Sequence, residues 1–176
     1  MIYNVAQLLK APVVTSQRVE LDNDDHLDLE ENEARLAGPI TGQVRLHRTN
    51  RGIFVDGVAE VPVELECTRC LKTFTQKFEL PIRELFYPVI DVETGLPVAA
   101  PEDDDLSYPI DQNHTLDLRE AIRQNLLLAL PIKTLCKEDC AGLCPQCGKD
   151  LNDGPCDCVP DTEDDRFAAL RQLLEQ

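Results

Sequence analysis

The sequence predicts an α+β protein: an antiparallel β-meander with a covering helix and a C-terminal, zinc-ribbon-like module rich in cysteine. Three observations lead to this prediction. Between residues 42 and 82, apolar and polar side chains alternate with a period of two, as in half-buried strands. Between residues 117 and 130, apolar residues recur with helical spacing. Six of the eight cysteines then fall between Cys136 and Cys158.

The segment before the meander contains one predicted helix and one acidic stretch. Asn4 can cap a short helix over residues 5–10, which ends before a proline. Between residues 18 and 36, acidic residues outnumber apolar ones, which predicts a solvated acidic edge or loop. Three leucines there are too sparse to fix a helix: Leu21, Leu27 and Leu29.

The meander is predicted to contain three strands. Val44 and Leu46 alternate with polar residues in the first, and Thr-Asn-Arg-Gly at 49–52 is a turn signal. In the second strand, one parity is apolar: Val55, Ala59, Val61, Val63, Leu65 and Cys67. In the third strand the apolar parity is Phe74, Phe78, Leu80 and Ile82. Pro62, on the polar parity, indicates an edge or a bulge. The pair Cys67 and Cys70 then falls at a hairpin tip.

Two helices and a long loop complete the prediction. Residues 88–113 contain four prolines and the acidic run 102–105, which predicts a long mobile loop. Asp117 and Glu120 form a cap-like pair at the start of the covering helix, whose predicted inner face is Leu118, Ala121, Ile122, Asn125, Leu126 and Ala129. We therefore expect an α+β meander domain over 1–135, a metal module over 136–160 packed on it, and a C-terminal helix over 161–176.

All eight cysteines are candidate metal ligands: Cys67, Cys70, Cys136, Cys140, Cys144, Cys147, Cys156 and Cys158. Closely spaced thiols with Gly and Pro between them can direct several sulfurs to one point, as tetrahedral Zn(II) requires. The N-terminal residues lack the pattern of a signal peptide, and no apolar stretch has the length of a membrane span, so we expect a cytoplasmic protein with reduced thiols. We predict one or two structural Zn(II) ions per chain.

The cysteines can be grouped in two ways. In the first, Cys144, Cys147, Cys156 and Cys158 form a local site, while Cys67 and Cys70 join Cys136 and Cys140. In the second, the four cysteines of residues 136–147 form one site. The first grouping is favoured because closing a long loop restricts the unfolded chain most.

Two enzymatic interpretations are weaker. A thioredoxin-like C-x-x-C opens a helix, whereas Cys67 and Cys70 precede a predicted strand, and Cys144 and Cys147 precede a turn. The spacing of Cys140, Cys144 and Cys147 also matches that of radical S-adenosylmethionine enzymes, but those use a large α/β barrel with the cluster loop near the start of the domain. No hydrolase or nucleotide-binding motif is present, so we expect a protein that is not an enzyme and has no small-molecule substrate.

The formal charge of −16 affects the choice of partner. Phosphate repels such a protein overall, so any RNA contact requires a local basic patch. Candidate basic residues are Arg45, Arg48 and Arg51 at one hairpin and Arg69, Lys72 and Lys77 near Cys67, although they can equally serve solubility. A protein partner with a basic surface could instead dock on the acidic stretches 22–33 or 102–105. The overall field slightly favours the protein partner.

The sequence resembles the YceD family, the large ribosomal RNA subunit accumulation proteins of bacteria and plastids. The matching segments are Asn-Val-Ala-Gln-Leu-Leu at 4–9, Leu-Glu-Cys-Thr-Arg-Cys-Leu at 65–71, Leu-Leu-Leu-Ala-Leu-Pro at 126–131 and the cysteine-rich run 135–152. The resemblance implies a non-enzymatic role in ribosome assembly, with large-subunit rRNA or a ribosomal protein as partner. The alternatives are a zinc-stabilised interaction adaptor unrelated to ribosomes and, less favoured, a thiol oxidoreductase.

Overall fold

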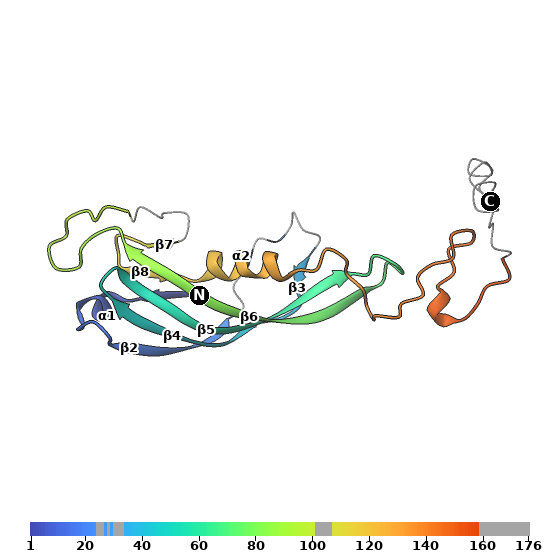
Figure 1. The fold of residues 1–176 in the computed structure, drawn as a ribbon, viewed down its shortest axis with the longest axis horizontal. Coiled ribbons are helices and arrows are strands. Elements are labelled where there is room, and N and C mark those ends of the chain that lie inside the picture. The colour runs from blue at the N-terminus through green and yellow to red at the C-terminus, as the bar shows by residue number, and fades with distance from the viewer. Residues whose placement is uncertain (24–26, 28, 30–33, 101–106, 159–176) are drawn as a thin grey trace, which may run out of the picture.

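The computed structural model describes residues 1–23, 27, 29, 34–100 and 107–158. In this part of the chain, a long curved sheet has α2 on one face, and the cysteine-rich segment extends from one end of the sheet (Figure 1). The elements are β1 (Ile2–Asn4), α1 (Ala6–Lys10), β2 (Ser16–Asn23), β3 (Arg35–Leu36), β4 (Ile40–Thr49), β5 (Gly52–Glu66), β6 (Thr73–Pro88), β7 (Ser107–Ile110), β8 (Thr115–Asp117), α2 (Arg119–Ala129) and a 3₁₀ turn at Leu151–Asp153.

The predicted three-stranded meander forms the centre of the sheet. Strands β4, β5 and β6 pair antiparallel in sequence order, and a tight turn joins Thr49 to Gly52. The main sheet has the order β2-β4-β5-β6-β7, with β3 pairing with β5 beyond the end of β4. Pro62 lies on the central strand β5, opposite Lys77 of β6. The predicted edge or bulge is instead a gap between the stretches paired with β4 and with β3, where the missing N–H is tolerated. Strands β1 and β8 form a separate two-stranded sheet.

The predicted apolar parities face the core. On β5 the side chains of Val55, Ala59, Val61, Val63 and Leu65 are all buried. On β6 the buried residues include Phe78, Leu80 and Ile82, while Phe74 is partly buried. Burial of these apolar side chains is the main stabilisation of such a sheet, since each fully buried Val or Leu contributes about 1.5–3 kcal/mol.

Helix α2 covers the inner face of the sheet through Ala121, Ile122 and Leu126, as predicted, whereas Ala129 at its end is exposed. Asn125, the polar residue on the same face, is satisfied because its Nδ2 donates to Glu84 Oε1 (3.0 Å) and to the carbonyl oxygen of Ala121 (2.9 Å). The helix begins at Arg119 with Leu118 as its N-cap, so the predicted cap-like pair of Asp117 and Glu120 does not form. Asp117 instead ends β8, where its Oδ1 accepts the backbone N–H of Arg119 (3.0 Å), and Glu120 accepts from Arg123 and Gln124.

The prediction for residues 18–36 was wrong in part. Residues 16–23 form β2, which pairs with β4 along its whole length. The three leucines that seemed sparse are buried in the core: Leu21, Leu27 and Leu29. One apolar face on an edge strand needs few apolar residues, because its other face remains in water. The other residues of the acidic stretch, 24–26, 28 and 30–33, lie outside the described residues.

The predicted loop 88–113 is also only partly a loop. Residues 107–110 form β7, which pairs parallel with the end of β6 and buries Ile110 completely. This strand is too short to show periodicity, and its proline lies on an edge strand, where the missing N–H is tolerated. The acidic run 102–105 and the predicted C-terminal helix 161–176 lie outside the described residues.

Candidate metal centre

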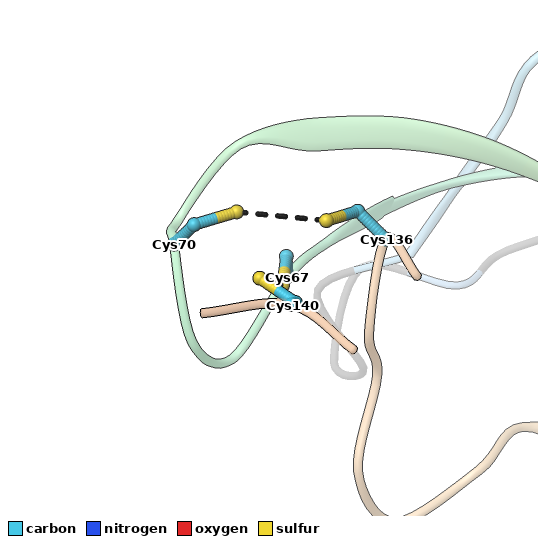
Figure 2. Close-up of side chains that lie close together, drawn as sticks. All are labelled: Cys67, Cys70, Cys136 and Cys140. Carbon is cyan, nitrogen blue, oxygen red and sulfur yellow. Dashed lines mark hydrogen bonds between the residues drawn. The ribbon is translucent and has the colours of Figure 1, made fainter. Parts of the chain in front are cut away.

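The first group of cysteines lies at the tip of the long β5–β6 hairpin. Cys67 and Cys70 come from the turn itself, and Cys136 and Cys140 come from the segment that follows α2 (Figure 2). The four sulfur atoms all lie within 4.8 Å of one another. The Sγ atoms of Cys67 and Cys140 are 3.8 Å apart, and those of Cys70 and Cys136 are 3.7 Å apart.

Backbone contacts place the second pair of cysteines against the first. Thr134 lies just before Cys136, and its carbonyl oxygen accepts both the N–H and the hydroxyl of Thr68, each at 2.9 Å. The Thr134 hydroxyl in turn donates to the carbonyl oxygen of Glu66 (2.6 Å). The segment after α2 is therefore bonded to the end of β5 independently of the sulfur atoms.

The second group is local in sequence. Cys144, Cys147, Cys156 and Cys158 also have all four sulfurs within 4.8 Å of one another. An antiparallel bridge between Leu143 and Asp150 closes the turn that contains the first two of them. Both groups thus correspond to the first of the two expected groupings, in which one site clips distant segments and the other is local.

The two C-x-x-C turns have the same backbone hydrogen bonds. In each, the N–H of the first cysteine donates to the carbonyl five residues later, and its carbonyl accepts the N–H four residues later. These bonds are Cys67 to Lys72 (3.0 Å) and Leu71 to Cys67 (2.9 Å) in the first turn, and Cys144 to Lys149 (2.8 Å) and Gly148 to Cys144 (2.9 Å) in the second. The residue after the second cysteine has a positive φ in both, 58° at Leu71 and 71° at Gly148. This conformation turns backbone N–H groups toward the sulfurs.

Those N–H groups change the acidity of the thiols. At Cys67, burial by itself raises the pKa of the thiol. Hydrogen bonds from the backbone N–H groups of Cys136, Cys70 and Arg69 outweigh this effect and lower the pKa to about 6. At Cys144, the N–H groups of Cys147 and Gln146 lower the pKa to about 6.

Neighbouring thiols respond in the opposite direction. Burial and hydrogen bonds from the adjacent sulfurs raise the pKa of Cys136 to about 12. In the second group, the sulfur of Cys147 is the main cause that raises the pKa of Cys158 to about 12. Without a cation, four sulfurs this close cannot all ionise, because each thiolate disfavours the next. A divalent ion among them would remove this repulsion.

The geometry fits a tetrahedral ion. With a metal–sulfur bond of about 2.3 Å, the edge of a ZnS₄ tetrahedron is about 3.8 Å, close to the two sulfur–sulfur distances of the first group. A disulfide requires about 2.05 Å, so neither pair is bonded in this structure. Four cysteine donors suit Zn(II) or an iron–sulfur centre, and each group could hold one ion or cluster.

The loop that carries the second group is attached to the first turn. Arg69 donates from Nη1 to the carbonyl oxygen of Cys140 (2.7 Å) and accepts the N–H of Leu143 (3.1 Å) on its own carbonyl. Lys72 forms an ion pair with Asp150 (2.6 Å), which lowers the pKa of that carboxyl to about 2. The two groups are therefore held together by contacts outside the sulfurs.

Asn152 is a site residue that the sequence analysis missed. Its Nδ2 donates to the Sγ of Cys140 (3.4 Å), which lowers the pKa of that thiol, and its Oδ1 accepts the N–H of Ala141 (3.0 Å). A single asparagine twelve residues from the sulfur has no spacing signal, although its place inside the cysteine-rich run could have suggested it.

The predicted basic patches are rearranged in the structure. Arg48 donates from Nε to the carbonyl oxygen of Leu9 (3.0 Å) and from Nη1 to that of Gly52 (3.2 Å), so its role is structural. Arg69 and Lys72 connect the two cysteine groups, and Lys77 pairs with Glu60. Arg45 is exposed on the outer face of β4. The expected hairpin cluster of Arg45, Arg48 and Arg51 therefore does not form one free surface.

Taken together, the described residues define a class: α+β proteins built on an antiparallel sheet whose longest hairpin ends in paired four-cysteine centres. The chain matches the family described as "Large ribosomal RNA subunit accumulation protein YceD" over residues 55–174, and it belongs to that family. The matched range includes all eight cysteines, so the expected family membership is confirmed.

Relatives occur in bacteria and in plants. YlbN, an uncharacterized protein of Bacillus subtilis, is 27% identical over 178 residues, covering 99% of this chain and 95% of the relative. An uncharacterized protein of Mycobacterium tuberculosis is 34% identical over 113 residues, covering 64% of this chain and 51% of its own length. The "Large ribosomal RNA subunit accumulation protein YCED homolog 1, chloroplastic" of Arabidopsis thaliana is 26% identical over 161 residues, 78% of this chain and 49% of the relative.

The chain thus spans about half the length of the mycobacterial and Arabidopsis relatives. No solved structure matches it. Among the described helices, none has the length and apolar character that crossing a membrane requires.

Proposed function

We propose that this protein is a non-enzymatic ribosome-biogenesis factor that supports large-subunit rRNA accumulation or processing by binding rRNA or a basic ribosomal protein in the cytoplasm. The observation that carries the proposal is the family match over residues 55–174, which includes most of the long β5–β6 hairpin and both cysteine groups. A plant relative over 161 residues bears the same family name. The family description names large-subunit rRNA accumulation, and the match covers β5 from residue 55, β6, α2 and both cysteine groups.

In this proposal Zn(II) is a structural cofactor, one ion in each cysteine group. The sulfur donors and the distances of 3.7 and 3.8 Å support this assignment. The residues that would hold the ions are the eight cysteines, and the N–H groups around Cys67 and Cys144 would stabilise their charge. The ions would fix the shape of the hairpin tip and take no part in a reaction.

Sedimentation tests the proposal. The tagged chain is expressed in a bacterial host that lacks its own family member, and lysates are separated on sucrose gradients. We expect the protein to sediment with large-subunit precursors and to restore the ratio of large- to small-subunit rRNA. Protein that stays at the top of the gradient, with an unrestored ratio, would contradict the proposal and favour an adaptor unrelated to ribosomes. Elemental analysis of the same protein, purified without chelator, should give up to two zinc ions per chain and negligible iron.

A further inference from the structure

The face of the sheet that points away from α2 carries a row of arginines. Directly opposed residues on neighbouring strands project to the same face. The register aligns Arg18 on β2 with Arg45 on β4, Arg45 with Asp56 on β5, and Asp56 with Arg83 on β6. One row across four strands therefore contains three arginines and one aspartate, at strand spacings of about 4.8 Å. We call these four residues the arginine row.

The single carboxylate does not neutralise the arginine row. Asp56 pairs with Arg83 at 3.3 Å, in a contact whose side chains are 45% and 78% exposed. Arg18 and Arg45 are both exposed, and among the described residues neither guanidinium has a hydrogen-bond or ion-pair partner. Within the part of the chain that the structure describes, their planar sets of N–H donors are therefore open to a ligand, and such donors match the oxygen geometry of a phosphate.

Folding alone does not account for the Arg18–Arg45 pair. Like charges directly opposite each other destabilise a strand pair. The chain has 33 acidic and only 17 basic residues, so an acidic or neutral partner for Arg45 would be the common outcome. A pair that works against stability on an open sheet face is more simply explained by a ligand that needs both charges.

The adjacent row supplies the other groups that RNA-binding sheets use. Ser16, His47, Phe54 and Leu85 are opposed in turn across the same four strands. The partly exposed ring of Phe54 lies on the same face, one row from Arg45, where a base could stack while arginines hold the backbone.

The charge of this face changes along the strands. Two rows from Arg45 toward the cysteine-rich tip, the opposed residues are Asp22, Thr41, Glu60 and Glu79. Glu60 in this row pairs with Lys77, whereas Asp22 and Glu79 still carry negative charge. The face therefore changes from basic at the arginine row to acidic two rows away, where a polyanion would be repelled. A basic ribosomal protein would be repelled by the arginine row itself, which favours RNA as its ligand.

We infer that the arginine row, with Phe54 beside it, binds the sugar-phosphate backbone of single-stranded rRNA segments. The inference rests on the proposed function and names the partner and surface for it. Arg18 and Arg45 contact phosphates, Arg83 contributes a third charge that Asp56 attenuates, and Phe54 offers a stacking surface.

Paired variants test the arginine row. Fluorescence anisotropy is measured with a labelled single-stranded RNA of about 20 nucleotides, copied from large-subunit rRNA, in a salt series. For R18Q/R45Q we expect the salt slope to fall by about 1.4, and the affinity at 0.1 M salt by roughly 25-fold, because each contact to a single strand contributes a slope of about 0.7. The control K10Q/R35Q removes the same charge from two exposed residues outside the row and should leave both quantities near wild type.

Two further measurements separate binding from folding. Asp56→Asn should strengthen RNA binding, since it releases Arg83 and removes the only negative charge of the row. R18Q/R45Q should melt at or above the wild-type temperature, because a like-charge pair has been removed.

The outcomes distinguish this inference from the proposed function. Equal losses in R18Q/R45Q and K10Q/R35Q would overturn the arginine row as a specific surface. A wild-type protein that sediments with precursors but does not bind the RNA probe at low salt would overturn the inference and favour a protein partner. A protein that does not sediment with precursors would instead contradict the proposed function, whatever its affinity for the probe.

Discussion

If each cysteine group binds one zinc ion, as proposed, removing two cysteines from the first group should affect the sheet far more than removing two from the second. Cys70→Ser with Cys136→Ser disables the first group, and Cys147→Ser with Cys156→Ser disables the second. Each double variant removes two thiols and should lose one zinc ion. The loops that the two ions close differ in length and in content, so the expected losses of stability can be worked out from the structure.

The first ion would close a loop between residues 66 apart, Cys70 and Cys136. This loop contains β6, β7, β8 and α2, which form much of the sheet and its cover. Loop-closure entropy for a crosslink of this length corresponds to about 4 kcal/mol at 25 °C, whereas the nine-residue separation of Cys147 and Cys156 corresponds to about 2.5 kcal/mol. No strand lies in the shorter loop, so opening it leaves the sheet unaffected.

Thermal melts followed by circular dichroism in reducing buffer check this prediction, with zinc counted by elemental analysis. We expect the first variant to lower the melting temperature of the sheet by roughly 10 °C, given 2–4 °C per kcal/mol for a chain of this size. The second variant should change it by far less. Equal shifts in the two variants, or no shift in the first, would refute the argument that the first ion acts as a long-range clip.

Two further predictions concern the sheet and its acid stability. A Cβ at Gly57 would lie 2.3 Å from the carbonyl oxygen of Gln43, so Gly57→Ala should lower the free energy of unfolding in urea by more than about 2 kcal/mol. The control Gly38→Ala, whose nearest new contact is 3.5 Å, should lower it by less than about 1 kcal/mol. Similar losses in the two variants would contradict the close approach of the strands at Gly57. Backbone N–H groups of the 113–115 turn lower the pKa of Asp111, so its stabilisation is full above the unfolded pKa near 3.8 and is lost as the pH falls through the lower folded value. The stability difference between wild type and Asp111→Ala should therefore vanish in strong acid. Asp111→Asn keeps an oxygen acceptor but should remove this pH dependence. A stability difference between wild type and Asp111→Ala that is unchanged down to pH 2 would contradict this assignment.

Sequence reasoning works here where a single local signal decides the structure. Alternation with a period of two located β4, β5 and most of β6, because a sheet with one buried face requires it. Helical spacing located α2, and the pair Cys67 and Cys70 marked the tip of the hairpin. Sequence reasoning failed for β2 and β7. Their few apolar side chains are buried only because these strands pair with β4 and β6.

By itself, the sequence determined the central meander, the covering helix and the set of cysteines available to a metal, since each depends on residues close together in the chain. The grouping of those cysteines was only a preference until the bonds between Thr134 and Thr68 placed Cys136 and Cys140 against the hairpin tip. The arginine row has no counterpart in the linear sequence, because Arg18, Arg45 and Arg83 become neighbours only through the register of four strands. Strand register depends on the packing of the whole sheet, and that is why the tertiary structure alone decides which side chains share a surface.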